Sequence, residues 1–242
     1  MSSRNSDVDR KSVIRNWQDL AKIIDHTILR PEATANQIVR LCEEAREFSL
    51  GAVMINSCQV ALASANLKGS DVKVGAVVGF PLGAALTSVK VFEAAEAMKL
   101  GAREIDMVMN IGALKSADRE LVASDIRAVV EVVHAQRSLV KVILEMGLLT
   151  DVEKRMACEI SETAGADFVK TSTGFLGGVA TVEDVALMRR AVTIGVKASG
   201  GIRTASDARK MIEVGANRLG TSSGVNIIRE WRAETDVKST VS

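Results

Sequence analysis

One short unit recurs along the 242-residue chain: a helical stretch, a Gly-Ala pair and then a strand of apolar residues. Glycine takes the left-handed conformation that stops a helix, and alanine lets the chain turn tightly into the strand. Repetition of this unit predicts alternating helices and strands, and therefore a parallel sheet covered by helices. The copies are LGAVMIN (50–56), LGAREIDMVMN (100–110), AGADFVKTS (164–172) and VGANRLGTS (214–222).

Further apolar segments fall between these copies and bring the number of expected strands to eight. They are the segment around Asp25, Val72 to Phe80, Leu139 to Met146 and Gly195 to Ser199. Eight strands alternating with helices predict a single-domain α/β fold, the (β/α)8 TIM barrel, in which working residues lie at the carboxyl ends of the strands. A doubly wound open sheet is the alternative, but no G-x-G-x-x-G motif follows the first strand. The barrel is expected to cover residues 13–233, between a disordered lead (1–12) and a polar tail (234–242).

Charge and cysteine content exclude several classes of partner. The 31 basic and 30 acidic residues nearly cancel, so no bulk field attracts nucleic acid or an anionic membrane. The three cysteines are widely spaced, which argues against a disulfide framework. The first residues carry no apolar signal segment, and no apolar run reaches membrane-spanning length. We therefore expect a cytoplasmic protein with no nucleic-acid or membrane partner.

A lysine stands where the apolar run FVK (168–170) meets the polar turn TSTG. Lys170 is expected at the carboxyl end of its strand, where burial disfavours the charged form and leaves a neutral amine that can form an imine with a carbonyl substrate. A lysine that reaches from a strand end to solvent is the plainer interpretation.

Two more charged residues are expected at tips of other strands. Lys197 lies on the strand directly after that of Lys170, and such neighbours are roughly 5 Å apart, so each amine would disfavour protonation of the other. Asp106 lies inside an apolar strand, where a carboxylate needs a cation. Taken singly, Asp106 fits a structural ion pair and Lys197 a phosphate clamp. Together the three predict imine chemistry at Lys170, with Asp106 and Lys197 moving protons.

Two turns rich in glycine and serine predict a phosphate site, because glycine frees backbone amides and the loops after strands seven and eight of such barrels commonly hold phosphate. They are SGGIRT (199–204) and GTSSG (220–224). Each turn taken alone also fits an ordinary loop. The only histidines are His26 and His134, too few for a typical catalytic zinc site, so no metal is expected. His26 is expected to be a buried, hydrogen-bonded residue.

Several segments resemble the short form of 2-deoxyribose-5-phosphate aldolase over almost the whole chain. They are IDHTIL (24–29), VGFPLG (78–83), EIDMVMNIG (104–112), FVKTSTGF (168–175), VKASGGIRT (196–204) and LGTSSG (219–224). The resemblance implies a barrel without cofactor that reversibly cleaves deoxyribose 5-phosphate to glyceraldehyde 3-phosphate and acetaldehyde in deoxyribose phosphate catabolism. Its partners would be small phosphosugars and aldehydes, and a homo-oligomer stays open. Another imine-forming phosphosugar aldolase is the nearest alternative, and a phosphosugar isomerase on the same barrel is a further one.

The resemblance also implies roles for individual residues. Lys170 would form the imine, with Asp106 and Lys197 as the proton relay. The phosphate would face Gly200, Gly201, Ser222 and Ser223, with Thr173 nearby. The substrate's hydroxyl side would be lined by Asp25 and Thr27. The chain departs from the family pattern at Met54, at Phe175, where the longer bacterial form carries a lysine, and in having no tyrosine.

Overall fold

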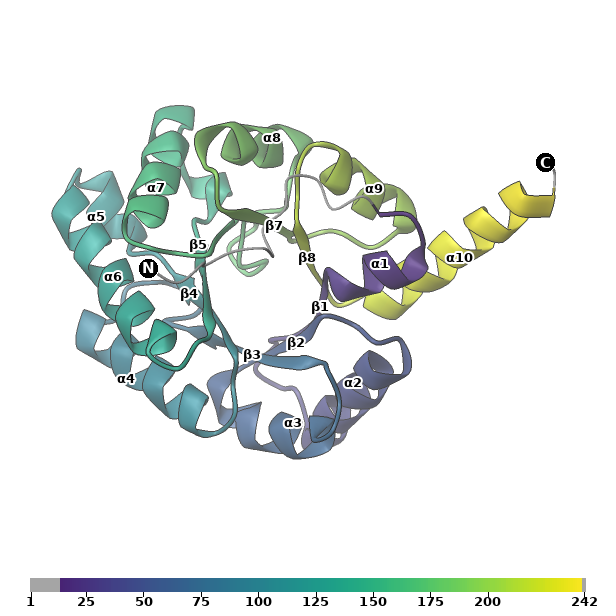
Figure 1. Ribbon diagram of the computed structural model, residues 1–242. Coiled ribbons are helices and arrows are strands. Elements are labelled where there is room, and N and C mark those ends of the chain that lie inside the picture. Colours follow the sequence, from purple (N-terminus) through teal and green to yellow (C-terminus); the bar gives the residue numbers. More distant parts are fainter. Residues whose placement is uncertain (1–13, 241–242) are drawn as a thin grey trace, which may run out of the picture.

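The computed structural model describes residues 14–240, which form a closed barrel of eight parallel strands surrounded by helices (Figure 1). Each strand pairs with the next in sequence, and β1 pairs with β8 to close the barrel. The strands are β1 (Ile24–Ile28), β2 (Ala52–Ile55), β3 (Lys73–Val78), β4 (Glu104–Val108), β5 (Leu139–Ile143), β6 (Phe168–Lys170), β7 (Gly195–Ser199) and β8 (Arg218–Thr221). The expected single-domain (β/α)8 barrel is confirmed.

Helices cover the outside of the barrel. They are α1 (Trp17–Lys22), α2 (Ala35–Glu47), α3 (Val60–Leu67), α4 (Thr87–Lys99), α5 (Ile111–Lys115), α6 (Arg119–His134), α7 (Asp151–Thr163), α8 (Val182–Ala191), α9 (Ala205–Glu213) and α10 (Gly224–Thr240). Thr150, Thr181 and Thr204 begin α7, α8 and α9, and each side chain accepts a hydrogen bond from the backbone of its helix's first turn.

The glycines of the recurring unit have the backbone roles that the sequence predicts. Gly101, Gly165 and Gly215 have φ angles of 114°, 93° and 109°, in the region that favours glycine. Gly51 differs, because its φ is not positive; there a Cβ atom would lie 2.2 Å from the carbonyl oxygen of Lys22. One unit therefore serves two needs, helix termination and close backbone approach.

α10 is the element that the sequence indicated least clearly, because no convincing helical stretch was expected after the last strand. Its first turns bury Ile227, Ile228 and Trp231, and this apolar spacing explains why the segment packs as a helix. The helix continues through Thr240 and leads away from the barrel (Figure 1). The expected lead, 1–12, lies outside the described residues, and the boundaries at 13 and 233 remain a proposal. Within residues 14–240, no helix is both long and apolar enough to cross a membrane.

The apolar core lies between the strands and the helices, whereas the inside of the barrel carries charge. In β4, Ile105 and Met107 belong to the apolar core, and the alternate residues Glu104 and Asp106 project to the opposite face. Both carboxylates are buried and meet cations from β5 to β8. The site is built on this inner face.

Candidate active site

Three of the residues singled out in the sequence meet inside the barrel. Lys170 and Lys197 are register partners on β6 and β7. Lys170 Nζ donates to Asp106 Oδ2 at 2.8 Å, and Lys197 Nζ donates to the same oxygen at 2.7 Å. All three are buried, and Lys170 keeps 3% of its surface exposed. A carboxylate thus lies between two amines, an arrangement suited to moving protons.

Three further charged residues, Lys141 on β5, Glu104 on β4 and Arg218 on β8, complete the network below Asp106. Lys141 Nζ donates to Glu104 at 2.5 Å and to Asp106 Oδ1 at 3.0 Å. Arg218 donates to Glu104 at 2.9 Å and to Asp25 Oδ1 at 2.7 Å. Sequence reasoning missed these residues, although Glu104 stands two positions before Asp106 and therefore shares its face of the strand.

The network holds one cation more than it holds carboxylates. Its cations are Lys141, Lys170, Lys197 and Arg218, and its carboxylates are Asp25, Glu104 and Asp106. Loss of one proton from a lysine would therefore balance the charges. Within the described part of the chain, Lys170 is ion-paired with Asp106 alone, whereas Lys197 and Lys141 each contact more than one carboxylate. The contacts therefore make Lys170 the amine that gives up its proton most readily.

The electrostatics agree with this assignment. Burial lowers the pKa of Lys170 to about 8, and Lys197 acts in the same direction while Asp106 opposes them. Burial would also lower the pKa of Lys141, but the Asp106 and Glu104 carboxylates outweigh it and raise that pKa above its usual value. For Asp106, burial favours the neutral acid, yet the three surrounding lysines hold its pKa well below the usual range. The result is an ionised Asp106 beside an amine that is partly neutral near pH 8.

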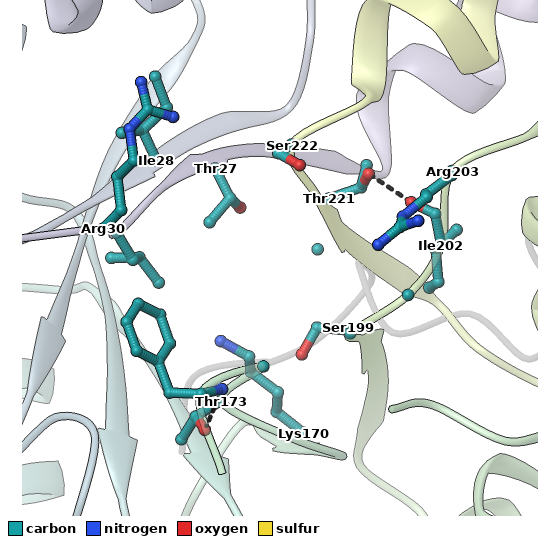
Figure 2. Close-up of a pocket in the computed structure, with 16 residues that line it drawn as sticks. Thr27, Ile28, Arg30, Lys170, Thr173, Ser199, Ile202, Arg203, Thr221 and Ser222 are labelled. Carbon is teal, nitrogen blue, oxygen red and sulfur yellow. Dashed lines mark hydrogen bonds between the residues drawn. The ribbon is translucent and has the colours of Figure 1, made fainter. Parts of the chain in front are cut away.

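A cavity of about 300 Å³ opens above this network at the carboxyl ends of the strands. Lys170 lines it, and its amine points toward the centre of the space (Figure 2). Asp106 and Lys197 are not part of the lining and lie beneath it. The other predicted site residues in the lining are Thr27, Thr173, Gly200, Gly201 and Ser222.

Two predicted substrate-binding residues do not line this cavity. Asp25 is fully buried, and its carboxylate pairs with Lys197 and Arg218. It therefore belongs to the charged network beneath the cavity. Ser223 lies just before α10, and its backbone amide donates to Thr221 Oγ1 at 2.8 Å. The structure therefore separates these two from the residues that face the open space.

Two arginines that sequence reasoning did not select also line the cavity. Arg203, in the turn after β7, lies with Ser222 on one side, and Arg30, after β1, lies on the opposite side (Figure 2). Arg30 pairs with Glu32 at 3.2 Å, whereas no ion pair involves Arg203 among residues 14–240. The predicted phosphate turn, SGGIRT (199–204), was a signal for Arg203, because it contains this cation.

Phe175, where the chain departs from the family pattern, lies at the cavity. The Phe175 ring lines the cavity and packs edge-on against Phe80, with ring centroids 5.1 Å apart. Phe80 follows β3, so the Phe175 ring points toward the β3 side of the cavity and away from the turns after β7 and β8.

His26 is 3% exposed, and its Nε2 lies 2.8 Å from Glu44 Oε2, but its Nδ1 has no partner among the described residues. The expected buried, hydrogen-bonded histidine is therefore only half satisfied.

Comparisons with known proteins agree on one family. The model of the DeoC/LacD family aldolases matches residues 20–230. A deoxyribose-phosphate aldolase from Thermoanaerobacter sp. (strain X514) is 57% identical over 216 residues, which cover 88% of this chain and 97% of that protein. A solved structure from Coccidioides immitis superposes with a TM-score of 0.88 and 42% identity, covering 95% of this chain and 92% of that one.

A tetrameric deoxyribose phosphate aldolase from Aeropyrum pernix superposes with a TM-score of 0.84 and 33% identity, covering 90% of this chain and 93% of that one. The match therefore spans the barrel, with the strands that carry the buried network and the turns that line the cavity. The chain belongs to the DeoC/LacD family of aldolases.

Proposed function

We propose that this chain is a Schiff-base aldolase that reversibly cleaves 2-deoxy-D-ribose 5-phosphate to D-glyceraldehyde 3-phosphate and acetaldehyde. The single observation that carries the mechanism is the position of Lys170, which faces the cavity while its amine contacts the ionised carboxylate that it shares with Lys197. The substrate assignment rests on relatives such as the Thermoanaerobacter protein named deoxyribose-phosphate aldolase.

The residues at hand account for each step of such a cleavage. The neutral amine of Lys170 adds to the C1 aldehyde of the open-chain sugar, and the resulting carbinolamine takes up a proton and loses water to give a protonated imine. A base removes the C3 hydroxyl proton, the C2–C3 bond breaks, and its electron pair moves into the imine to give an enamine, releasing glyceraldehyde 3-phosphate. Protonation at C2 and addition of water then release acetaldehyde and restore the amine.

Asp106 and Lys197 are the proposed proton carriers in these steps. Asp106 Oδ2 accepts hydrogen bonds from both Lys170 and Lys197, so a proton can pass between these groups without a change of side-chain position. Asp25 and Arg218 hold Lys197 and the lower network in place. We assign them a positioning role.

The phosphate group is proposed to bind at the turns after β7 and β8. Gly200 and Gly201 have φ angles of 98° and 77°, which leave the backbone free to approach an anion, and Ser222 adds a hydroxyl group. Arg203 adds a positive charge on the same side of the cavity. Thr27 lies toward the substrate's hydroxyl groups in this assignment, and roles for Thr173 and Ser223 in binding the substrate stay predictions.

A direct assay tests this proposal. The protein is incubated with deoxyribose 5-phosphate, and release of glyceraldehyde 3-phosphate is followed with a coupled dehydrogenase, while a second sample with acetaldehyde is treated with borohydride. Cleavage together with a stable adduct is the expected result. An adduct without cleavage of this sugar would indicate an imine aldolase for another phosphosugar, and absence of an adduct would favour an isomerase.

We also propose that the chain forms a homo-oligomer in the cytoplasm. The Aeropyrum pernix relative is described as tetrameric, and this chain has four apolar side chains in and just before α4 that are each at least half exposed, those of Leu82, Leu86, Val89 and Phe92. The three cysteines are unpaired, which suits a reducing compartment. Light scattering on a size-exclusion column tests the subunit count, and a monomer at micromolar concentration would contradict the proposal.

A further inference from the structure

Glu145 is a buried carboxylate that the proposed chemistry does not use. It follows β5, is fully buried, and has a φ angle of 55°, a left-handed conformation that is unfavourable for residues other than glycine. The backbone on either side is tied to β6: Leu144 N donates to the Lys170 carbonyl at 2.9 Å, and Met146 N donates to that of Thr171 at 3.0 Å. These bonds place Glu145 directly beside the strand end that carries Lys170.

The carboxylate occupies both hydrogen-bond donors of one residue in the lining of the cavity. Glu145 Oε2 accepts from the Thr173 backbone N at 3.0 Å and from Thr173 Oγ1 at 2.5 Å. The hydroxyl oxygen in turn accepts from Phe175 N at 3.1 Å. Because a hydroxyl group has one proton, Thr173 has no donor left for a substrate phosphate while this arrangement holds.

The loop that follows Thr173 packs closely around this carboxylate. We call residues 171–181 the β6–α8 loop. A Cβ atom at Gly178 would come within 2.7 Å of Glu145 Oε1, and one at Gly147 within 3.3 Å of the Gly178 Cα atom. Oε1 and the nearby Ser172 Oγ are buried without hydrogen-bond partners. The loop therefore lies directly on Glu145.

The other side of the same loop meets the proposed phosphate end. Ala180 N donates to the Gly200 carbonyl at 3.0 Å, and a Cβ atom at Gly200 would lie 3.1 Å from the Gly178 carbonyl oxygen. A displacement of the loop would consequently move the backbone that is proposed to hold the phosphate.

We propose that Glu145 is a positioning residue for phosphate recognition: it anchors the β6–α8 loop through Thr173, and the loop holds the Gly200–Gly201 turn in place. Thr173 then supports the loop and does not itself donate to phosphate. The inference rests on the proposed function, because it concerns the end of the cavity assigned to the phosphate.

A double-mutant cycle tests the anchor. Glu145→Ala should lower kcat/KM for deoxyribose 5-phosphate on the order of tenfold, mainly through KM, because it removes both hydrogen bonds to Thr173. Thr173→Val removes only the hydroxyl bond and should lower kcat/KM in the same way but less. The double variant should be no worse than Glu145→Ala, because the bond to the Thr173 hydroxyl is already lost when the carboxylate is removed. In Glu145→Ala, activity on unphosphorylated deoxyribose should fall much less than activity on the phosphorylated sugar, since the change spares the amine that forms the imine.

Two control variants test whether the effect is specific to the contact between Glu145 and Thr173. Glu145→Gln keeps an oxygen acceptor for Thr173 and should retain the preference for the phosphorylated sugar. Glu153 makes the same pair of contacts, accepting from Thr150 N at 2.7 Å and Thr150 Oγ1 at 3.0 Å, but it does so outside the cavity lining. Glu153→Ala should therefore leave the preference unchanged. If Glu145→Ala does not fold, Gly178→Ala, which pushes the loop off the intact carboxylate, should produce the same selective loss.

Two kinetic outcomes would overturn the inference. Impairment by Thr173→Val but not by Glu145→Ala would show that the Thr173 hydroxyl contacts the phosphate directly. Equal losses on both sugars would show that Glu145 supports the whole site and not phosphate recognition. Hydrogen exchange of the 171–181 peptides needs no substrate: Glu145→Ala should accelerate it, and unchanged exchange would refute the anchor even if the proposed substrate is wrong.

Discussion

Lys170 and Lys197 share one acceptor, because both amines donate to Oδ2 of Asp106, at 2.8 and 2.7 Å. Only Lys170 also reaches the cavity. Lys197 has a second carboxylate partner in Asp25, whereas Lys170 pairs, among residues 14–240, with Asp106 alone. Lys170 therefore meets both requirements of imine formation: its amine faces the cavity, and it loses its proton readily.

The Asp106→Asn variant should keep the shape of the site and lose the proton acceptor. We expect kcat for deoxyribose 5-phosphate cleavage to fall at least about a hundredfold, the lower end for general acid–base catalysis. Borohydride trapping with acetaldehyde should persist, since removing the carboxylate takes away the group that favours protonated Lys170. Near-normal turnover combined with a lower melting temperature would instead make Asp106 a structural ion-pair residue.

Imine formation should depend on pH through Lys170. Burial lowers the pKa of this amine to about 8, so the neutral fraction increases as pH rises through that value. The rate of adduct formation with acetaldehyde should therefore rise from pH 6 to 8, roughly tenfold for each pH unit well below the pKa, and level off above it. Stopped-flow or quenched trapping over this range measures the midpoint, and a midpoint near 10 would mean that Lys170 is not perturbed.

Lys141 and Glu104 should shift this midpoint in opposite directions. Lys141→Met removes a cation that lowers the pKa of Lys170, so that pKa should rise and the rate of imine formation at pH 7 should drop by roughly tenfold. Glu104→Gln removes a negative charge from the same network and should move the midpoint to lower pH. The double variant restores the charge balance and should return toward the original profile. Both single variants shifting in the same direction would show that packing, not charge, explains the effect.

Arg203 should contribute to recognition of the phosphate. Arg203→Gln removes the charge that has no ion-pair partner among the described residues, and a charge-assisted hydrogen bond of this kind is worth roughly 1.5 to 3 kcal/mol. We expect KM for deoxyribose 5-phosphate to rise about tenfold or more, with no change for plain deoxyribose. Arg209→Gln is a matched control, since Arg209 pairs with Glu234 and is not part of the cavity lining. Equal effects of the two variants on KM would show that Arg203 does not bind the phosphate.

The sequence was sufficient for the barrel because the Gly-Ala unit marks where helices stop and strands start. It was also sufficient for placing Lys170 beside Lys197, since consecutive strands of a barrel are neighbours. The lower network was harder to predict. Lys141 stands alone in an apolar strand, and a short strand does not reveal from its sequence which face points inward.

Contacts that depend on loop conformation could not be predicted. The resemblance implied that Thr173 lies near the phosphate, but the sequence contains no sign that Glu145, 28 positions before Thr173, would engage both of its donors. The Phe175 ring likewise packs on Phe80, a pairing fixed by the paths of two loops. Turn residues predict where a loop lies, whereas its hydrogen bonds depend on partners from distant strands.

Identification of the lysine that carries the imine tests the central claim most directly. The protein is treated with acetaldehyde and borohydride, digested, and mapped by mass spectrometry, with Lys170→Leu as the control. We predict one ethylated lysine, Lys170, and no adduct or turnover in a folded Lys170→Leu protein. An adduct on Lys197, or one that persists in the Lys170→Leu variant, would contradict the account.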